Sequence, residues 1–274
     1  MKFNKILTIQ DISCYGQCSL TVALPVVSAC GIETCVLPSA VLSTHTGGFT
    51  GFTFRDLTED MPDIRKHWKK EGISFDAIYT GYLGSTKQID YVDDIFSAYP
   101  DSVKLVDPAM ADNGNLYYGF DMEFVERMKL LCGKADYLIP NVSEACFLTG
   151  VEYRLEYDES YVHELLEKLT ALGAKNIILT GISYQPGTTG VVVFEGGNYQ
   201  YYRHDKIASG CHGTGDIYAS AFVGALGNGK TPYESAKIAA DYVLECIKET
   251  QKDADHWYGA RFEPVLYKLI EMVR

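Results

Sequence analysis

The stretch from Ser209 to Asp216 has the residue types of a phosphoryl-transfer site and opens a long apolar helix. A glycine-rich turn that leads into a helix leaves free backbone N–H groups at the positive end of the helix dipole, where anions bind. The amides of Gly213, Thr214 and Gly215 can therefore hold a phosphoryl group. Asp216 can then take a proton from a hydroxyl group as that hydroxyl group attacks the phosphoryl group. The alternative is a first-turn aspartate that only stabilises its helix.

Composition and charge restrict the class of protein. The chain has 274 residues, 47% of them hydrophobic, which suits a single α/β domain over residues 1–274. The net charge of −12 argues against a nucleic-acid partner. The first apolar segment, Ile6 to Ile9, is too short for a signal peptide or a membrane span, so we expect a cytoplasmic protein without a membrane partner. Eight scattered cysteines without a CxxC pair are typical of reduced core thiols.

The order of the elements predicts a doubly wound, mostly parallel central sheet flanked by helices. A strand at 5–10, a helix at 20–30 and a strand at 32–37 form a βαβ unit. The turn Gly196-Gly197-Asn198 indicates an antiparallel hairpin at the edge of the sheet. We expect the other strands and the closing helices at 76–80, 103–106, 137–139, 176–179, 217–226, 232–250 and 262–273.

Polar loops follow the predicted strands, and the carboxyl ends of parallel strands line one ligand-binding crevice. Asp107 and Asp112 lie five residues apart at one such strand end. They are candidates for a magnesium–phosphate site, because Mg²⁺ takes few protein carboxylates and keeps waters and phosphate oxygens. Asp-Pro at a strand end is also ordinary turn chemistry. Glu144 is either a first-turn helix carboxylate or a residue that holds a metal-bound water.

Six segments, in this order, resemble the ribokinase-like superfamily and, within it, its pyridoxal kinase branch. The resemblance covers nearly the whole chain. The segments are Thr8-Ile9-Gln10-Asp11-Ile12-Ser13 with Gly16, Leu42-Ser43-Thr44-His45-Thr46-Gly47, Thr80-Gly81-Tyr82, Asp107-Pro108-Ala109-Met110-Ala111-Asp112, Pro140-Asn141-Val142-Ser143-Glu144 and Gly213-Thr214-Gly215-Asp216.

The resemblance implies a ribokinase-like fold and ATP-dependent phosphorylation of the 5′-hydroxymethyl group of a vitamin B6 vitamer. It implies ATP and Mg²⁺ as cofactors and a homodimer, and it leaves a monovalent cation open. Asp216 is then the catalytic base, with an anion hole at Gly213, Thr214 and Gly215. The implied substrate contacts are Asp11, Ser13, His45, Thr46, Tyr82 and Asp216. The implied ATP contacts are Asp107, Asp112, Tyr117, Asn141, Glu144 and Thr180, with Mg²⁺ held, partly through water, by Asp107, Asp112 and Glu144.

Departures from the family pattern bear on the substrate. Asp11 stands where many members have serine, and its carboxylate could accept from a ring hydroxyl or pair with an amine or a protonated pyridine nitrogen, which leaves pyridoxamine open. Ile139 replaces a frequent threonine and Ala111 a usual glycine. The sister hydroxymethylpyrimidine kinases read HGTG followed by cysteine, whereas Asp216 here favours the B6 branch. A hydroxymethylpyrimidine or other small-alcohol kinase, and a non-catalytic B6-binding regulator, are the alternatives.

Overall fold

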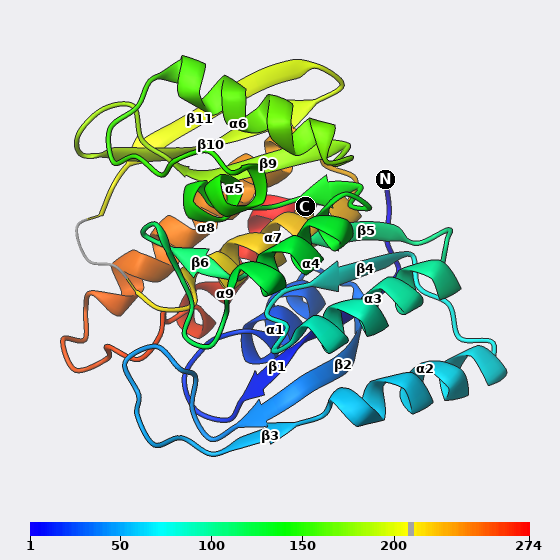
Figure 1. Cartoon of the computed structure of the whole chain (residues 1–274). Helices are drawn as coiled ribbons and strands as arrows, with labels where there is room; N and C mark the ends of the chain where they lie inside the picture. Colours follow the sequence, from blue (N-terminus) through cyan, green and yellow to red (C-terminus); the bar gives the residue numbers. More distant parts are fainter. Residues whose placement is uncertain (208–210) are drawn as a thin grey trace.

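The computed structural model describes residues 1–207 and 211–274 (Figure 1). It contains a nine-stranded sheet and a separate two-stranded hairpin. The strands are β1 Lys5–Ser13, β2 Glu33–Leu42, β3 Phe54–Asp56, β4 Ala77–Thr80, β5 Val103–Val106, β6 Ala111–Asp112, β7 Asn115–Leu116, β8 Tyr137–Leu138, β9 Asn176–Ile182, β10 Thr188–Glu195 and β11 Asn198–Asp205. The α-helices are α1 Leu20–Ala29, α2 Met61–Lys70, α3 Thr86–Ala98, α4 Met122–Cys132, α5 Val142–Thr149, α6 Glu159–Ala171, α7 Thr214–Gly227, α8 Pro232–Thr250 and α9 Leu266–Val273, with 3₁₀ turns at Thr58–Asp60 and Glu263–Val265.

The large sheet has the strand order β11-β10-β9-β8-β5-β4-β1-β2-β3. The six strands from β9 to β2 are parallel to one another, which confirms the predicted doubly wound arrangement. The predicted antiparallel hairpin, β10 and β11, forms one edge. The other edge is the short strand β3, which pairs antiparallel with β2 and was not among the strands predicted from the sequence.

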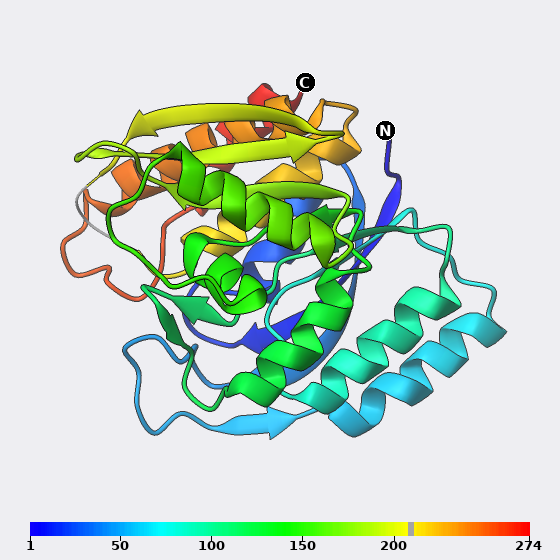
Figure 2. The same cartoon turned by 45° about the horizontal axis from the view of Figure 1, so that its top comes forward.

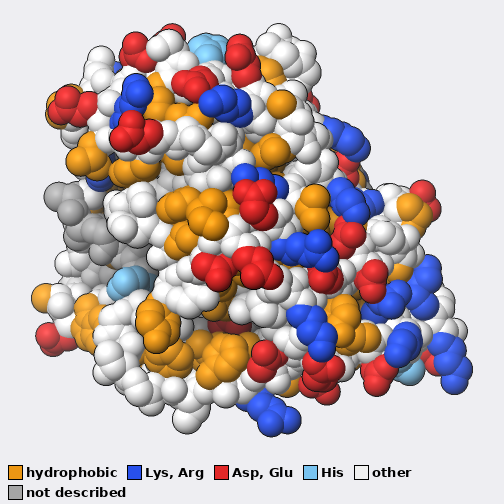
Figure 3. Space-filling view, in the orientation of Figure 1, with side chains coloured by type: hydrophobic (Ala, Val, Ile, Leu, Met, Phe, Trp, Pro, Cys, Tyr) orange, Lys and Arg blue, Asp and Glu red, His pale blue; other side chains and the backbone are white. Residues whose placement is uncertain are grey.

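Helices cover both faces of the sheet and divide the core into two layers (Figures 1 and 2). Apolar side chains of α2 to α6 pack on one face, and those of α1, α7, α8 and α9 pack on the other. The near-continuous apolar strands of the centre follow from this double coverage. Within the described ranges, no helix combines the length and the hydropathy needed to cross a membrane. The face shown in Figure 3 carries acidic and basic side chains interspersed.

Local sequence signals explain where the helices begin. Side chains that accept an N–H of the first turn start five helices: Ser85, Asp121, Asn141, Asp158 and Thr231. Such a cap contributes about 1 kcal/mol to the stability of a helix. Pro232 occupies the first turn of α8, where its missing N–H costs nothing, and the helix has the predicted bounds.

Strand β1 is longer than the sequence predicts. It continues through Asp11 to Ser13, whereas we expected a loop from residue 11. The register with β2 shifts between Gln10 and Ile12: Asp11 alone lies opposite Ser39 and Ala40, so the extra residue of this bulge is on β2. Bulges turn a side chain away from the regular alternation and are frequent next to active sites.

Helices α1 and α7 pack so closely that a glycine is required at their contact. A Cβ added at Gly224 would lie 2.4 Å from the Cys30 Sγ and 3.0 Å from its Cβ. We expect Gly224→Ala to lower the free energy of unfolding by about 1–2 kcal/mol, because overpacking outweighs the gain in helix propensity. Urea denaturation measures this effect.

Cys30→Ala provides the matched background for Gly224→Ala, because it removes the sulfur that the new methyl group would meet. The cost of Gly224→Ala should be much smaller there. An equal cost in both backgrounds would contradict the assigned contact.

Candidate active site

The first turn of α7 presents free amides to the carboxyl end of the sheet. Its cap, Gly213, has φ 78° and offers no side chain to the turn. A Cβ at Gly213 would lie 2.0 Å from the Gln17 carbonyl oxygen, so only glycine fits. The amides of Thr214 and Gly215 are therefore left for an anion. The beginning of the predicted motif, Ser209, lies outside the described residues, as does Gly210.

Asp216 lies in that first turn and is half-buried. Burial raises its pKa to about 6, and the negative charge of Asp11 adds to the rise. The backbone N–H of Ser19 donates a hydrogen bond to it and opposes the rise. A carboxylate with a pKa near the working pH is suited to accept a proton from a hydroxyl group.

Polar groups at the end of β1 and in the loop that follows it gather around Asp11, which is 4% exposed. The Ser13 hydroxyl donates to its Oδ2 at 3.1 Å, and the Ser19 side chain also hydrogen-bonds to it. Burial raises the pKa of Asp11 despite these bonds. Tyr82 lies near Asp11. Burial raises the pKa of the Tyr82 hydroxyl to about 12, and the charge of Asp11 contributes to this rise. The ring of Tyr82 stacks on Phe120 with centroids 5.4 Å apart.

His45 joins two loops that are far apart in the sequence. Its Nδ1 accepts the Gly47 N–H at 3.0 Å, so the proton is on Nε2, which donates to the Tyr258 carbonyl at 2.6 Å. Burial lowers its pKa, so the ring is neutral near pH 7. Both ring nitrogens are thus used by the backbone, and only the ring face and edge remain for a ligand. Thr46 is exposed beside it.

The second group of candidates surrounds the start of α5. Asn141 and Glu144 form a reciprocal capping box. The Glu144 carboxylate accepts the N–H of Asn141 at 2.8 Å and of Met110 at 3.1 Å, and this ties the loop after β5 to the loop after β8. Burial raises its pKa to about 7. The Thr180 N–H donates to the Pro140 carbonyl at 2.9 Å, which brings the end of β9 to the same place.

Further acidic groups complete this half of the site. Burial raises the pKa of Asp107 well above its ordinary value, and the charges of Glu144 and Asp216 add to the rise. Burial raises the pKa of the Tyr117 hydroxyl. Four nearby acids add to this rise: Glu144, Asp107, Asp216 and Asp112. The short β6–β7 hairpin carries Asp112 out to the surface. Asp216 is therefore close both to Asp11 with its polar partners and to the acidic residues around Asp107.

The carboxylates create an unbalanced negative charge. The charges that most affect Asp107, Glu144 and Asp216 are those of other acids. Protonation or a bound cation relieves such repulsion. Within residues 1–207 and 211–274, no three His, Cys, Asp or Glu side chains come together as a ready-made metal cage. Any ion here would need oxygen ligands from waters or phosphates as well.

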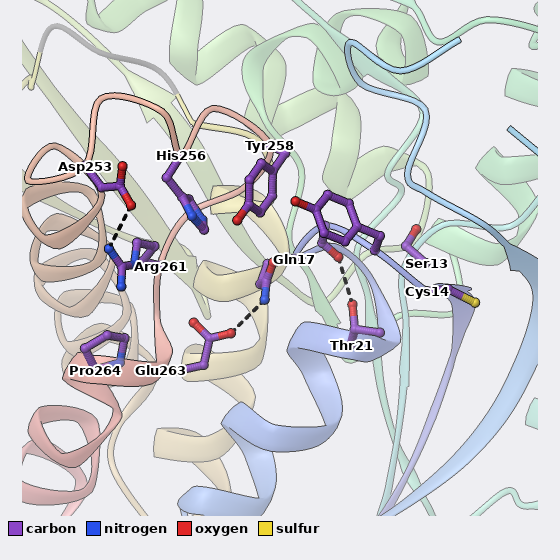
Figure 4. Close-up of a pocket in the computed structure, with 12 residues that line it drawn as sticks. Ser13, Cys14, Gln17, Thr21, Asp253, His256, Tyr258, Arg261, Glu263 and Pro264 are labelled. Carbon is purple, nitrogen blue, oxygen red and sulfur yellow. Dashed lines mark hydrogen bonds and ion pairs between the residues drawn. The ribbon is translucent and has the colours of Figure 1, made fainter. Parts of the chain in front are cut away.

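The segment 251–261 also lies beside the candidate site. The sequence did not predict this, because the segment carries no recognisable motif. A cleft of about 510 Å³ lies between it and the loop after β1 (Figure 4). Tyr258 packs on Tyr15 with ring centroids 4.8 Å apart, and Trp257 packs on Phe49 at 4.7 Å. Three chain segments thus meet in one aromatic cluster, defined as Tyr15, Phe49, Trp257 and Tyr258. The run of aromatic residues from 256 to 258 was the available signal.

Comparison with known proteins gives the family. Residues 24–260 match the family described as phosphomethylpyrimidine kinase. A Bacteroides thetaiotaomicron protein described as a candidate phosphomethylpyrimidine kinase, in a crystal form with pyridoxal, is 38% identical, with a TM-score of 0.92 over 98% of this chain and 96% of that chain. Pyridoxal kinase from Lactobacillus plantarum is 29% identical, with a TM-score of 0.91 over 98% of this chain and 97% of that chain. The hydroxymethylpyrimidine/phosphomethylpyrimidine kinase of Bacillus subtilis is 27% identical over 89% of this chain and 83% of its own.

The fold and these matches define a kinase of the ribokinase-like superfamily, as the sequence motifs indicated. The chain belongs to the phosphomethylpyrimidine kinase family, and its resemblance to the pyridoxal kinase branch is confirmed.

The raised pKa of Asp216 predicts a pH dependence of stability. The folded protein keeps this proton up to about pH 6, whereas the unfolded chain releases it near 3.8, so stability falls as pH rises through this window. Asp216→Asn should remove about 1–3 kcal/mol of that fall. Chemical denaturation of both proteins from pH 4 to 8 measures the difference.

Asp158→Asn is the control, because Asp158 is an exposed helix cap whose pKa is lowered by the Ser160 hydroxyl and the Tyr161 N–H. It should change stability little and leave the shape of the curve as it is, because asparagine caps a helix about as well as aspartate. Parallel curves for wild type and Asp216→Asn would contradict the burial of this charge.

Proposed function

We propose that the protein transfers the γ-phosphoryl group of ATP to the 5′-hydroxymethyl group of a vitamin B6 vitamer. One observation carries the proposal: Asp216, at the amide-rich start of α7, faces Asp11 and its polar loop on one side and Asp107 with Glu144 on the other. An acceptor alcohol and a phosphate chain can therefore meet at a single carboxylate.

The proposed step is an in-line displacement at the γ-phosphorus. The Asp216 carboxylate accepts the proton of the hydroxymethyl group, and the alcohol oxygen forms a bond to phosphorus. The bond between phosphorus and the bridging oxygen breaks, and ADP leaves. The amides of Gly213, Thr214 and Gly215 stabilise the charge on the phosphoryl oxygens, and positioning supplies most of the remaining acceleration.

We assign the phosphate side to the acidic half of the site. Its carboxylates and the tyrosine beside them suit a magnesium–ATP complex, because hard cations prefer oxygen ligands and this half has negative charge to neutralise. Both Glu144 oxygens already accept backbone N–H groups, so Glu144 would reach Mg²⁺ through water. Asp107 and Asp112 would hold it more directly, while Asn141 and Thr180 border the phosphates.

We assign the ring side to the end of β1, where Asp11 and Ser13 lie, and to Tyr82. The stacked pair Tyr82 and Phe120 offers a flat surface that suits an aromatic ring. Asp11 and Ser13 would bind ring substituents, while His45 would contribute its ring face and Thr46 its hydroxyl. A single domain, a homodimer, a monovalent cation and a cytoplasmic location stay predictions.

The comparisons support this substrate class and keep one competitor. The Bacteroides relative in a crystal form with pyridoxal and the Lactobacillus pyridoxal kinase favour a B6 vitamer. The family description and the Bacillus relative favour hydroxymethylpyrimidine. Asp216 in place of the cysteine expected for the latter group decides our preference.

An acceptor panel tests the proposal. ADP release is measured with pyridoxal, pyridoxamine, pyridoxine and hydroxymethylpyrimidine side by side. We expect kcat/KM for the best B6 vitamer to exceed that for hydroxymethylpyrimidine at least tenfold. The reverse order would make the protein a hydroxymethylpyrimidine kinase, and tight B6 binding without turnover would make it a non-catalytic binder.

The variant Asp11→Asn asks which vitamer the carboxylate selects, since it removes the charge and keeps the shape. A hydrogen bond to a charged group is worth about 1.5–3 kcal/mol. We therefore expect kcat/KM for pyridoxamine to fall at least tenfold more than kcat/KM for pyridoxal. Equal losses for both vitamers would show that Asp11 does not recognise the amine.

A further inference from the structure

Ser19 has a backbone conformation that its residue type disfavours. It has φ 53° and ψ −128°, in the left-handed half of conformational space that favours glycine. It is 6% exposed and caps the start of α1. Residues held in such conformations persist only where their surroundings enforce them, and they gather at functional sites.

All three polar groups of Ser19 have partners. Its carbonyl accepts the N–H groups of Val22 and Ala23 at 3.0 and 2.8 Å, as the cap of a helix does. Its N–H donates to the Asp216 carboxylate, and its side chain hydrogen-bonds to Asp11. One residue thus links the α1 terminus, the proposed base and strand β1.

In the described helix α1, the side chain of Ser19 does not make the hydrogen bond that a capping serine usually makes. A capping serine normally accepts an N–H of the first helical turn through its hydroxyl oxygen. Ser19 makes no such bond within the described helix α1. Because Asp11 as a carboxylate only accepts, the Ser19 hydroxyl is the donor of their bond. The Ser19 hydroxyl therefore bonds to Asp11 instead of capping helix α1.

We propose that Ser19 is a positioning residue for phosphoryl transfer: its N–H orients Asp216 toward the acceptor alcohol, and its hydroxyl fixes Asp11 in the same frame. The base and the loop that holds the acceptor ring then move as one unit. This inference rests on Asp216 as the base, proposed above, and is independent of which alcohol is the acceptor.

Ser19→Gly separates positioning from a purely structural role. Glycine adopts this conformation without strain and keeps the N–H, so a turn residue would gain or keep stability and activity. We expect instead that the variant keeps or raises Tm but loses the hydroxyl on Asp11 and, through the backbone freedom of glycine, the fixed orientation of the N–H on Asp216. It should therefore lower kcat at least fivefold, raise the KM of the acceptor and leave the KM of ATP within twofold. Wild-type kcat and acceptor KM in this variant would overturn the proposal.

A double-mutant cycle with Asp11→Asn tests the hydroxyl separately. The Ser19 hydroxyl acts through Asp11, so Ser19→Gly should raise the acceptor KM much less in the Asp11→Asn background than in the wild type. Fully additive effects of the two substitutions would overturn this part of the proposal.

Ser102→Ala is the matched control, because Ser102 is a buried loop residue whose hydroxyl donates to the Phe75 carbonyl far from the site. It should lower Tm and leave kcat and both KM values unchanged. All kinetics use the acceptor that the wild type phosphorylates fastest, whether B6 vitamer or pyrimidine. Failure of the B6 assignment in the panel is therefore distinct from failure of the role of Ser19.

Discussion

The structure depends on a carboxylate that is partly withdrawn from water at the positive end of a helix. Burial and, to a smaller extent, the charge of Asp11 raise the pKa of Asp216, while the Ser19 N–H and the start of α7 favour its charged form. The balance leaves the group with a pKa of about 6, charged near neutral pH and still basic enough to take a proton. The amides that would carry the phosphoryl charge begin the same helix, so base and anion site share one rigid element.

The parallel sheet gathers the remaining groups around this carboxylate. Loops after β1, β4, β5, β8 and β9 all emerge at one end, and backbone hydrogen bonds tie them together. Glu144 joins the loops after β5 and β8, and His45 joins the loop after β2 to the segment near Tyr258. These links fix the positions of the loops before any ligand binds, which reduces the ordering cost of catalysis.

Much of this arrangement could be predicted because its signals are local. Alternating strands and helices, the Pro232 start of α8 and the glycine-rich turn into α7 are written in short stretches. The bulge of β2 opposite Asp11 was not predictable, because it arises from the pairing of the two strands. The role of Ser19 was hidden for a similar reason, since its partners come from β1 and α7 and its conformation opposes its residue type. The contribution of Tyr258 comes through its backbone carbonyl, which carries no residue signature.

The most direct test compares wild type with Asp216→Asn in two measurements, turnover of the best acceptor and calorimetric titration with ATP and Mg²⁺. If Asp216 is the base, turnover falls by about 10²–10⁴-fold while nucleotide affinity stays within threefold, because the amides and the acidic half of the site remain. Turnover within twofold of the wild type would contradict this account.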